Sequence, residues 1–204
     1  MARADLTDYM NYQLLQKLQG TLFFTVADLA RTAGIQPASA RVLATRYAQA
    51  GAFVRLKNNM YVAGQKWPSL ETPEFFRLAN LIQVPSYISF MTALAFYGVT
   101  TQVQRDFFES VSIKRSARYQ VRGTVFNFYK IKPDYYSGFV KQDGFFIATP
   151  EKAFLDAVYL YSAGKYKIDF SSLDLSGLDK KRLKTSLKPF PARTGRIARE
   201  LCKI

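Results

Sequence analysis

The chain has 204 residues, of which 49% are hydrophobic and 22% charged, a composition typical of a folded globular protein with one medium or two small domains. It contains no histidine and one cysteine, Cys202, which excludes an internal disulfide and argues against structural zinc or any other metal site. The formal net charge of +14 indicates a polyanionic partner, of which nucleic acid is the most abundant.

The same composition argues against an enzyme and against a membrane protein. Without histidine, the commonest general base is missing, together with the Ser-His and Cys-His pairs that activate nucleophiles. We therefore expect neither a catalytic site nor a cofactor. No apolar stretch reaches the ~20 residues that cross a bilayer, and residues 1–8 lack the order of a secretion signal. These features predict a cytoplasmic protein.

Basic residues are concentrated at both ends of the chain. Residues 1–66 hold eight Lys or Arg and three Asp or Glu, and residues 161–204 hold eleven and four. Residues 67–160 hold ten and eight, so the middle is nearly neutral. Binding to a ribosome or to a membrane surface would produce the same total charge, but nucleic acid is the partner that the next features favour.

Three helices are predicted before residue 51. Apolar side chains three or four positions apart predict an amphipathic helix over residues 7–19. A second helix begins at Thr25, which a carboxylate follows three residues later, and ends at Gly34. Pro37 then suits the first position of a third helix that runs to Ala50. Two helices joined by a short turn are typical of a helix-turn-helix.

The third helix has one stripe of small or apolar residues at helical spacing, namely Ala40, Leu43, Ala44 and Tyr47. This stripe is expected to pack against the other helices. The remaining residues are then free to contact a ligand: Ser39, Arg41, Val42, Thr45, Arg46 and Gln49.

A hairpin follows the third helix. Residues 53–57 and 60–63 are strand-like, and the Asn58-Asn59 pair between them tolerates the positive φ of a tight turn. Alternation places Val54, Leu56 and Tyr61 against the helices and leaves Arg55 and Lys57 on the opposite face. Residues 1–66 are thus predicted to form a winged helix-turn-helix domain.

Such a domain reads DNA with a helix that enters the major groove, flanked by cations that bind phosphates. Gln36, Ser39, Arg41 and Arg46 meet the first need, and Arg55 and Lys57 the second. The complete set of expected DNA-binding residues is Gln36, Ser39, Arg41, Thr45, Arg46, Arg55, Lys57, Asn58 and Asn59. The alternative is that the trihelical unit docks another protein, with these residues simply solvated.

The rest of the chain, residues 67–204, predicts an α+β domain. Helices are expected over residues 73–83 and 89–98, and strands near 110–113, 125–129 and 145–147, forming a small, mostly antiparallel sheet. Thr149-Pro150-Glu151 opens a strongly apolar helix that runs to about Ser162. Basic segments on either side of Pro189-Phe190-Pro191 close the chain, and Leu178, Leu183 and Leu187 are spaced to bury one side of the tail.

Three groups of residues in this domain suggest a functional role, but a structural explanation is favoured for each of them. Glu151 and Lys152 resemble a catalytic pair but also satisfy the needs of a helix start. Asp106, Glu109 and Lys114 are too loosely spaced for a metal-dependent nuclease. The interleaved aromatic residues suggest a hydrophobic strand face more than base stacking, and these are Phe126, Phe128, Tyr129, Tyr135 and Tyr136.

Several segments of the second domain resemble the AbiEi antitoxin family. They are Pro85–Ser89, Ala93–Val99, the strand at Val111 and Ile147–Asp156, of which the Thr-Pro-Glu-Lys-Ala helix start is the most specific. The resemblance covers residues from about 5 to 165. It implies a transcriptional regulator of a type IV toxin-antitoxin or abortive-infection system.

By this resemblance, the winged domain binds inverted repeats in its own promoter and represses the operon. The positions that match the recognition helix and wing are Ser39, Arg41, Thr45, Arg46, Arg55, Lys57 and Asn58. The second domain would counteract a partner toxin similar to nucleotidyltransferases, and no catalytic role transfers to this chain. The alternative function is a non-enzymatic adaptor whose winged module docks an acidic partner.

Overall fold

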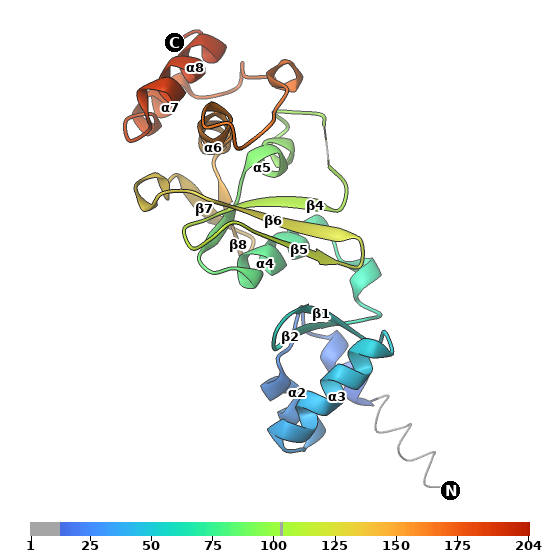
Figure 1. Cartoon of the computed structure of the whole chain (residues 1–204). Coiled ribbons are helices and arrows are strands. Elements are labelled where there is room, and N and C mark those ends of the chain that lie inside the picture. The colour runs from blue at the N-terminus through green and yellow to red at the C-terminus, as the bar shows by residue number, and fades with distance from the viewer. Residues whose placement is uncertain (1–12, 103) are drawn as a thin grey trace, which may run out of the picture. The chain divides into compact units, whose positions relative to one another are not determined.

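The computed structural model describes residues 13–102 and 104–204, which divide into two compact units between Glu74 and Phe75 (Figure 1). The sequence pattern predicted a domain boundary between residues 66 and 67. In the structure, the short 3-10 helix η1 (Trp67–Ser69) and the first turn of the next helix belong with the first unit. Trp67 and Leu70 are both buried, so the segment predicted as a linker has buried side chains of its own.

The first unit contains the predicted helices and hairpin in the predicted order. Residues 13–19 are helical, and residues 7–12 of the first predicted helix lie outside the described part of the chain. The other elements are α2 (Val26–Ala33), α3 (Pro37–Gln49), β1 (Phe53–Lys57) and β2 (Met60–Ala63). Phe24 forms an additional antiparallel bridge to Tyr61, so a third short segment flanks the hairpin. This arrangement is a winged helix-turn-helix.

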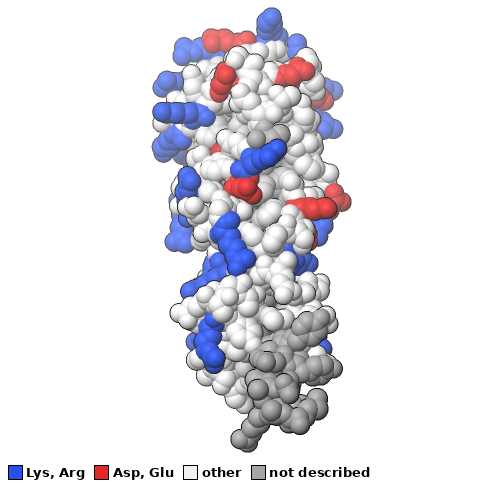
Figure 2. All heavy atoms as spheres, turned by 90° about the vertical axis from the view of Figure 1, so that its right-hand side faces the viewer, with Lys and Arg blue, Asp and Glu red and all other residues white. Residues whose placement is uncertain are grey.

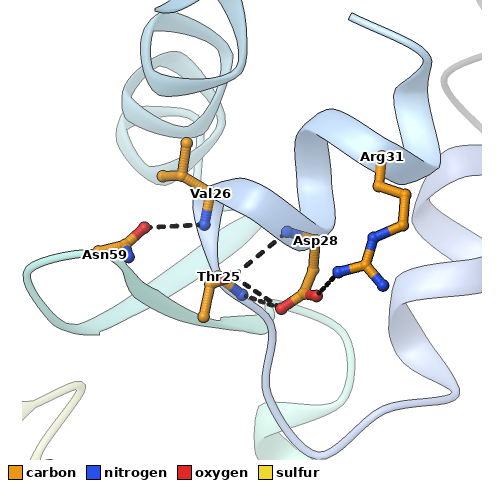
Figure 3. Close-up of polar contacts among 5 residues, drawn as sticks. All are labelled: Thr25, Val26, Asp28, Arg31 and Asn59. Carbon is orange, nitrogen blue, oxygen red and sulfur yellow. Dashed lines mark hydrogen bonds and ion pairs between the residues drawn. The ribbon is translucent and has the colours of Figure 1, made fainter. Parts of the chain in front are cut away.

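Local sequence explains where α2 begins and ends. The Thr25 hydroxyl accepts a hydrogen bond from the Asp28 N–H, and the Asp28 carboxylate accepts one from the Thr25 N–H, which together form a capping box (Figure 3). At the other end, Gly34 adopts the left-handed conformation, with φ of 66°. Its N–H bonds to the carbonyl groups of Ala30 and Arg31, so each end of α2 has a capping interaction.

The core of the first unit depends on two alanines of α3. Ala40 and Ala44 are fully buried against α2 and the first helix, where their small side chains allow close approach. Leu43 and Tyr47 pack at the edge of the same cluster, and the Tyr47 ring meets the Phe53 ring edge-on. The predicted stripe of α3 is therefore confirmed.

The two faces of the hairpin differ from the prediction. Arg55 and Tyr61 are directly opposed in the antiparallel pairing, and opposed residues project from the same face. Phe53 and Tyr61 belong to the helix core, whereas Val54 and Leu56 are buried outside that cluster. Placing Val54 and Leu56 against the helices and Arg55 on the opposite face was therefore wrong. Apolar residues point to both faces of β1, so strand alternation could not identify the face toward the helices.

The second unit is a mixed six-stranded sheet with helices, which confirms the α+β class. The strand order is β5-β6-β4-β3-β8-β7, with three antiparallel and two parallel pairings. The strands are β3 (Ser86–Ile88), β4 (Phe107–Ser112), β5 (Ala117–Val121), β6 (Thr124–Lys130), β7 (Phe139–Gln142) and β8 (Phe145–Ala148). Three of them, β3, β5 and β7, were not predicted. β3 has only three residues, and β5 and β7 are edge strands with exposed polar residues.

The helices of this unit are α4 (Thr72–Ile82), α5 (Phe90–Phe96), α6 (Pro150–Ser162), α7 (Lys180–Ser186) and α8 (Ala192–Cys202), with 3-10 turns η2 (Pro133–Tyr135) and η3 (Phe170–Ser172). Three of them, α4, α5 and α6, begin within one residue of the predicted starts, whereas no starts were predicted for the last two helices. α6 packs against α5 and α8. Leu178, Leu183 and Leu187 are buried as predicted. No helix within the described ranges has both the length and the apolar character needed to cross a membrane.

A buried ion pair fixes α6 to the sheet. The Lys152 ammonium group bonds to Asp156 one turn later, and Asp156 also accepts hydrogen bonds from Tyr87 Oη at 3.0 Å and Ser89 Oγ at 2.8 Å. Burial lowers the pKa of Lys152, and the Asp156 carboxylate opposes that shift. Gly138 lies directly against this lysine, where an added Cβ would come within 3.1 Å of Lys152 Cγ.

A second buried carboxylate lies on β4. Glu109 is 2% exposed, and its Oε2 accepts hydrogen bonds from the Met91 N–H at 3.1 Å and the Tyr166 hydroxyl at 2.9 Å. Burial raises the pKa of Glu109 to about 7, although these hydrogen bonds oppose the shift. It has no ion-pair partner among residues 13–102 and 104–204.

Removing one partner of the buried ion pair should destabilise the protein strongly. Asp156→Ala leaves the Lys152 ammonium group buried without its counter-charge, which costs about 3–5 kcal/mol. We expect this loss in the free energy of unfolding measured by urea titration. Arg182→Ala, which breaks the exposed pair with Asp179, is the control and should cost under about 1 kcal/mol. Equal effects of the two variants would contradict a structural role for the buried pair.

The raised pKa of Glu109 predicts a specific pH dependence of stability. Between the ordinary pKa of 4.5 and about 7, the folded protein binds more protons at Glu109 than the unfolded chain does. The free energy of unfolding should therefore fall as pH rises through this interval. Subtracting the urea-unfolding profile of Glu109→Gln from that of the wild type isolates this contribution. A difference that stays constant from pH 4.5 to pH 8 would contradict it.

Candidate nucleic-acid interface

The solvent-facing side of α3 carries the residues suited to read a base pair. Arg41, Val42, Thr45 and Arg46 are all exposed and form two pairs of neighbours, each four residues apart. Val42 is 60% exposed, which is unusual for an apolar side chain in the middle of a helix. Because Ala40 and Ala44 are buried on the opposite side, this surface is held outward by the core.

Charge favours an anionic ligand for this surface. α3 contains two arginines and no acidic residue. Neither Arg41 nor Arg46 forms an ion pair with any residue in the described part of the chain. In Figure 2, the described atoms at the bottom of the view include blue Lys and Arg side chains.

The first part of α3 adds two polar groups. Gln36 immediately precedes the helix and makes no capping hydrogen bond with its side chain, and Ser39 lies in the first turn. Both are exposed. They are therefore available at the end of the helix that helix-turn-helix proteins direct toward base edges.

The hairpin supplies cations beside this helix. α3 packs against β1, which carries Arg55 and Lys57. Arg55 is exposed, with its guanidinium 3.4 Å from Asn58 Oδ1, and Lys57 is partly exposed at the end of the strand. The structure thus brings the α3 group and the wing cations onto adjacent elements of one unit.

Asn59 has a structural role that the sequence interpretation missed. It adopts φ of 60° in the turn, and its Oδ1 accepts a hydrogen bond of 2.9 Å from the Val26 N–H (Figure 3). Val26 is the first residue of α2, so Asn59 satisfies an N–H group that the capping box leaves open. The tip of the wing is therefore fastened to the start of α2. A contact between Asn59 and DNA stays a prediction.

The remaining candidate residues belong to the second unit, where they have structural roles. Thr149 caps α6 as predicted, accepting a hydrogen bond from the Lys152 N–H. Glu151 and Lys152 are both buried, and Glu151 Oε1 accepts a hydrogen bond from the Asp179 N–H. Phe126 and Phe128 are buried in the sheet, as a hydrophobic strand face requires.

Comparison with known proteins identifies the fold. No protein-family model matches the chain, and no curated protein matches it. Among solved structures, it is similar to the RV2827C protein from Mycobacterium tuberculosis, with a TM-score of 0.66 and 13% sequence identity. The match covers 96% of this chain and 76% of that chain, so it spans both units.

The Asn59 contact predicts a loss of stability that is separate from any DNA contact. Asn59→Gly removes the acceptor of the Val26 N–H but keeps a residue that tolerates positive φ. We expect the free energy of unfolding to fall by about 1 kcal/mol, the usual effect of losing a cap. Asn59→Asp, which keeps a side-chain oxygen as acceptor and also tolerates positive φ, is the control. If both variants unfold at the same urea concentration, the Asn59 hydrogen bond does not stabilise the unit.

Proposed function

We propose that this protein is a DNA-binding transcriptional regulator whose winged unit recognises an operator. The observation that carries this proposal is the position of Arg41, Val42 and Arg46 on the exposed side of α3, opposite the buried alanines. The winged helix-turn-helix fold and the net charge of +14 support it.

In this proposal, α3 enters the major groove. Each arginine can form two hydrogen bonds to O6 and N7 of a guanine, which is the commonest specific contact in that groove. Val42 supplies an apolar contact suited to the methyl group of thymine. Arg55 and Lys57 bind phosphates and set the orientation of the unit on the duplex.

We also propose that the regulator is the autorepressing antitoxin of a type IV toxin-antitoxin system. The support is the sequence resemblance to the AbiEi family in the second unit, from Pro85 to Asp156. In this role, the winged unit would repress its own operon, and the second unit would counteract a nucleotidyltransferase-like toxin. Expressing the adjacent open reading frame with and without this chain tests the antitoxin role, because only an antitoxin restores growth.

A titration by gel shift tests operator recognition. The probe is the duplex upstream of the protein's own gene, with a random duplex of equal length as competitor. Specific recognition requires a preference of at least about 10³ for the promoter. A smaller preference would contradict the regulator proposal and favour the adaptor alternative, in which partners from a nuclease-treated lysate remain bound.

Two substitutions should have different signatures in this assay. Arg46→Ala should cost about 1–3 kcal/mol at the operator and relax sequence preference, because it removes a base contact. Lys57→Ala should weaken binding to all duplexes alike and reduce the salt slope by about one.

Arg31→Ala is the matched control, since it removes an arginine of the same unit that is paired with Asp28. Its affinity should equal that of the wild type. If Arg31→Ala and Arg46→Ala weaken binding equally, total charge rather than the α3 surface determines affinity.

A further inference from the structure

The second unit contains an open cavity that the proposed DNA contact does not use. Its volume is about 470 Å³, within the range of small-molecule sites. Its lining includes the carboxyl groups of Glu109 and Asp169, the aromatic residues Phe107, Tyr129 and Tyr166, and the lysines Lys165 and Lys167.

Glu109 keeps the capacity to accept a further hydrogen bond. A carboxylate has about four acceptor sites. The Met91 N–H and the Tyr166 hydroxyl both donate to Oε2. At least one acceptor site therefore remains on a buried group that has no ion-pair partner within the described ranges.

The aromatic residues give this cavity rigid, flat walls. The Tyr129 and Tyr166 rings meet at right angles, with centroids 5.4 Å apart, and Phe90 supports both from the fully buried side at 4.8 Å and 5.1 Å. Phe90 also adopts φ of 55°, which is rare for a bulky residue and persists only where surrounding contacts impose it.

The lysines distinguish among possible ligands. Lys165 and Lys167 are exposed, whereas the acidic residue beside them, Asp169, already accepts hydrogen bonds from the Ser171 N–H and hydroxyl. Two lysines would repel a polyamine, although a cation alone would suit Glu109. A ligand that satisfies both ends carries hydrogen-bond donors on a flat ring and a negative charge at the other end.

We propose that this cavity binds a nucleotide whose base carries an amino group. The amino group donates to Glu109, the base stacks on Tyr129, and the phosphate lies at Lys165 and Lys167. This site is distinct from the α3 surface and does not depend on the proposed operator recognition.

Isothermal titration of the full chain with AMP, GMP, CMP and UMP tests the proposal. We expect saturable binding of at least one amino-bearing nucleotide below about 1 mM. UMP lacks the amino group, so it should bind at least about tenfold more weakly. No saturable binding, or equal affinity for UMP, would overturn the proposal.

Substitutions separate the two ends of the site. Glu109→Gln should remove the preference over UMP, while Lys165→Ala/Lys167→Ala should weaken all nucleotides alike and reduce the dependence on salt. Lys180→Ala/Lys181→Ala removes two exposed lysines of α7 and should change nothing. If the two lysine pairs behave alike, the cavity does not hold the phosphate.

Two further variants keep the test decisive. Tyr129→Leu preserves the carboxyl group but removes a stacking wall, so it replaces Glu109→Gln if that variant fails to fold. The Tyr129→Leu variant should bind all four nucleotides at least about threefold more weakly than the wild type does. Unchanged affinity would overturn the proposed stacking. Arg41→Ala/Arg46→Ala should bind nucleotide as the wild type does. Lost binding in that variant would place the nucleotide on the winged unit.

Discussion

The close packing of Ala40 and Ala44 is the constraint on which the proposed DNA-binding surface depends. Both alanines are fully buried in the core of the winged unit, so they determine which side of α3 faces solvent. A larger residue at either position would force α3 away from α2, because interiors are packed without room for added methylene groups. Arg41, Val42 and Arg46 are therefore presented outward by two residues that are themselves fully buried.

The sequence predicted those parts of the structure that depend on local physics. The starts of α2, α3 and α6 follow from capping residues and prolines, and the exposed side of α3 follows from helical periodicity. The prediction of which hairpin face meets the helices was wrong because Phe53 and Val54 are both buried, on opposite sides of β1. Strand alternation identifies a buried face only when the other face is polar.

Features that depend on distant contacts could not be predicted. Asn59 bonds to Val26 across 33 positions, and Asp156 is bonded by Tyr87 across 69. Glu109 was considered only beside its sequence neighbours, whereas its partner Tyr166 lies 57 positions away. A single sequence carries no signal for such pairs. The contacts of Asp156 and Glu109 account for two buried carboxyl groups of the second unit, and Glu109 and Tyr166 also line its cavity.

In the proposed function, α3 reads guanines from the major groove. Interference by dimethyl sulfate tests it most directly, because methylation of guanine N7 blocks an arginine contact on that edge of the base. We predict that methylated guanines in each operator half-site prevent binding of the wild type, and that Arg46→Ala becomes insensitive at one of them. Binding that tolerates N7 methylation throughout the operator would contradict the account.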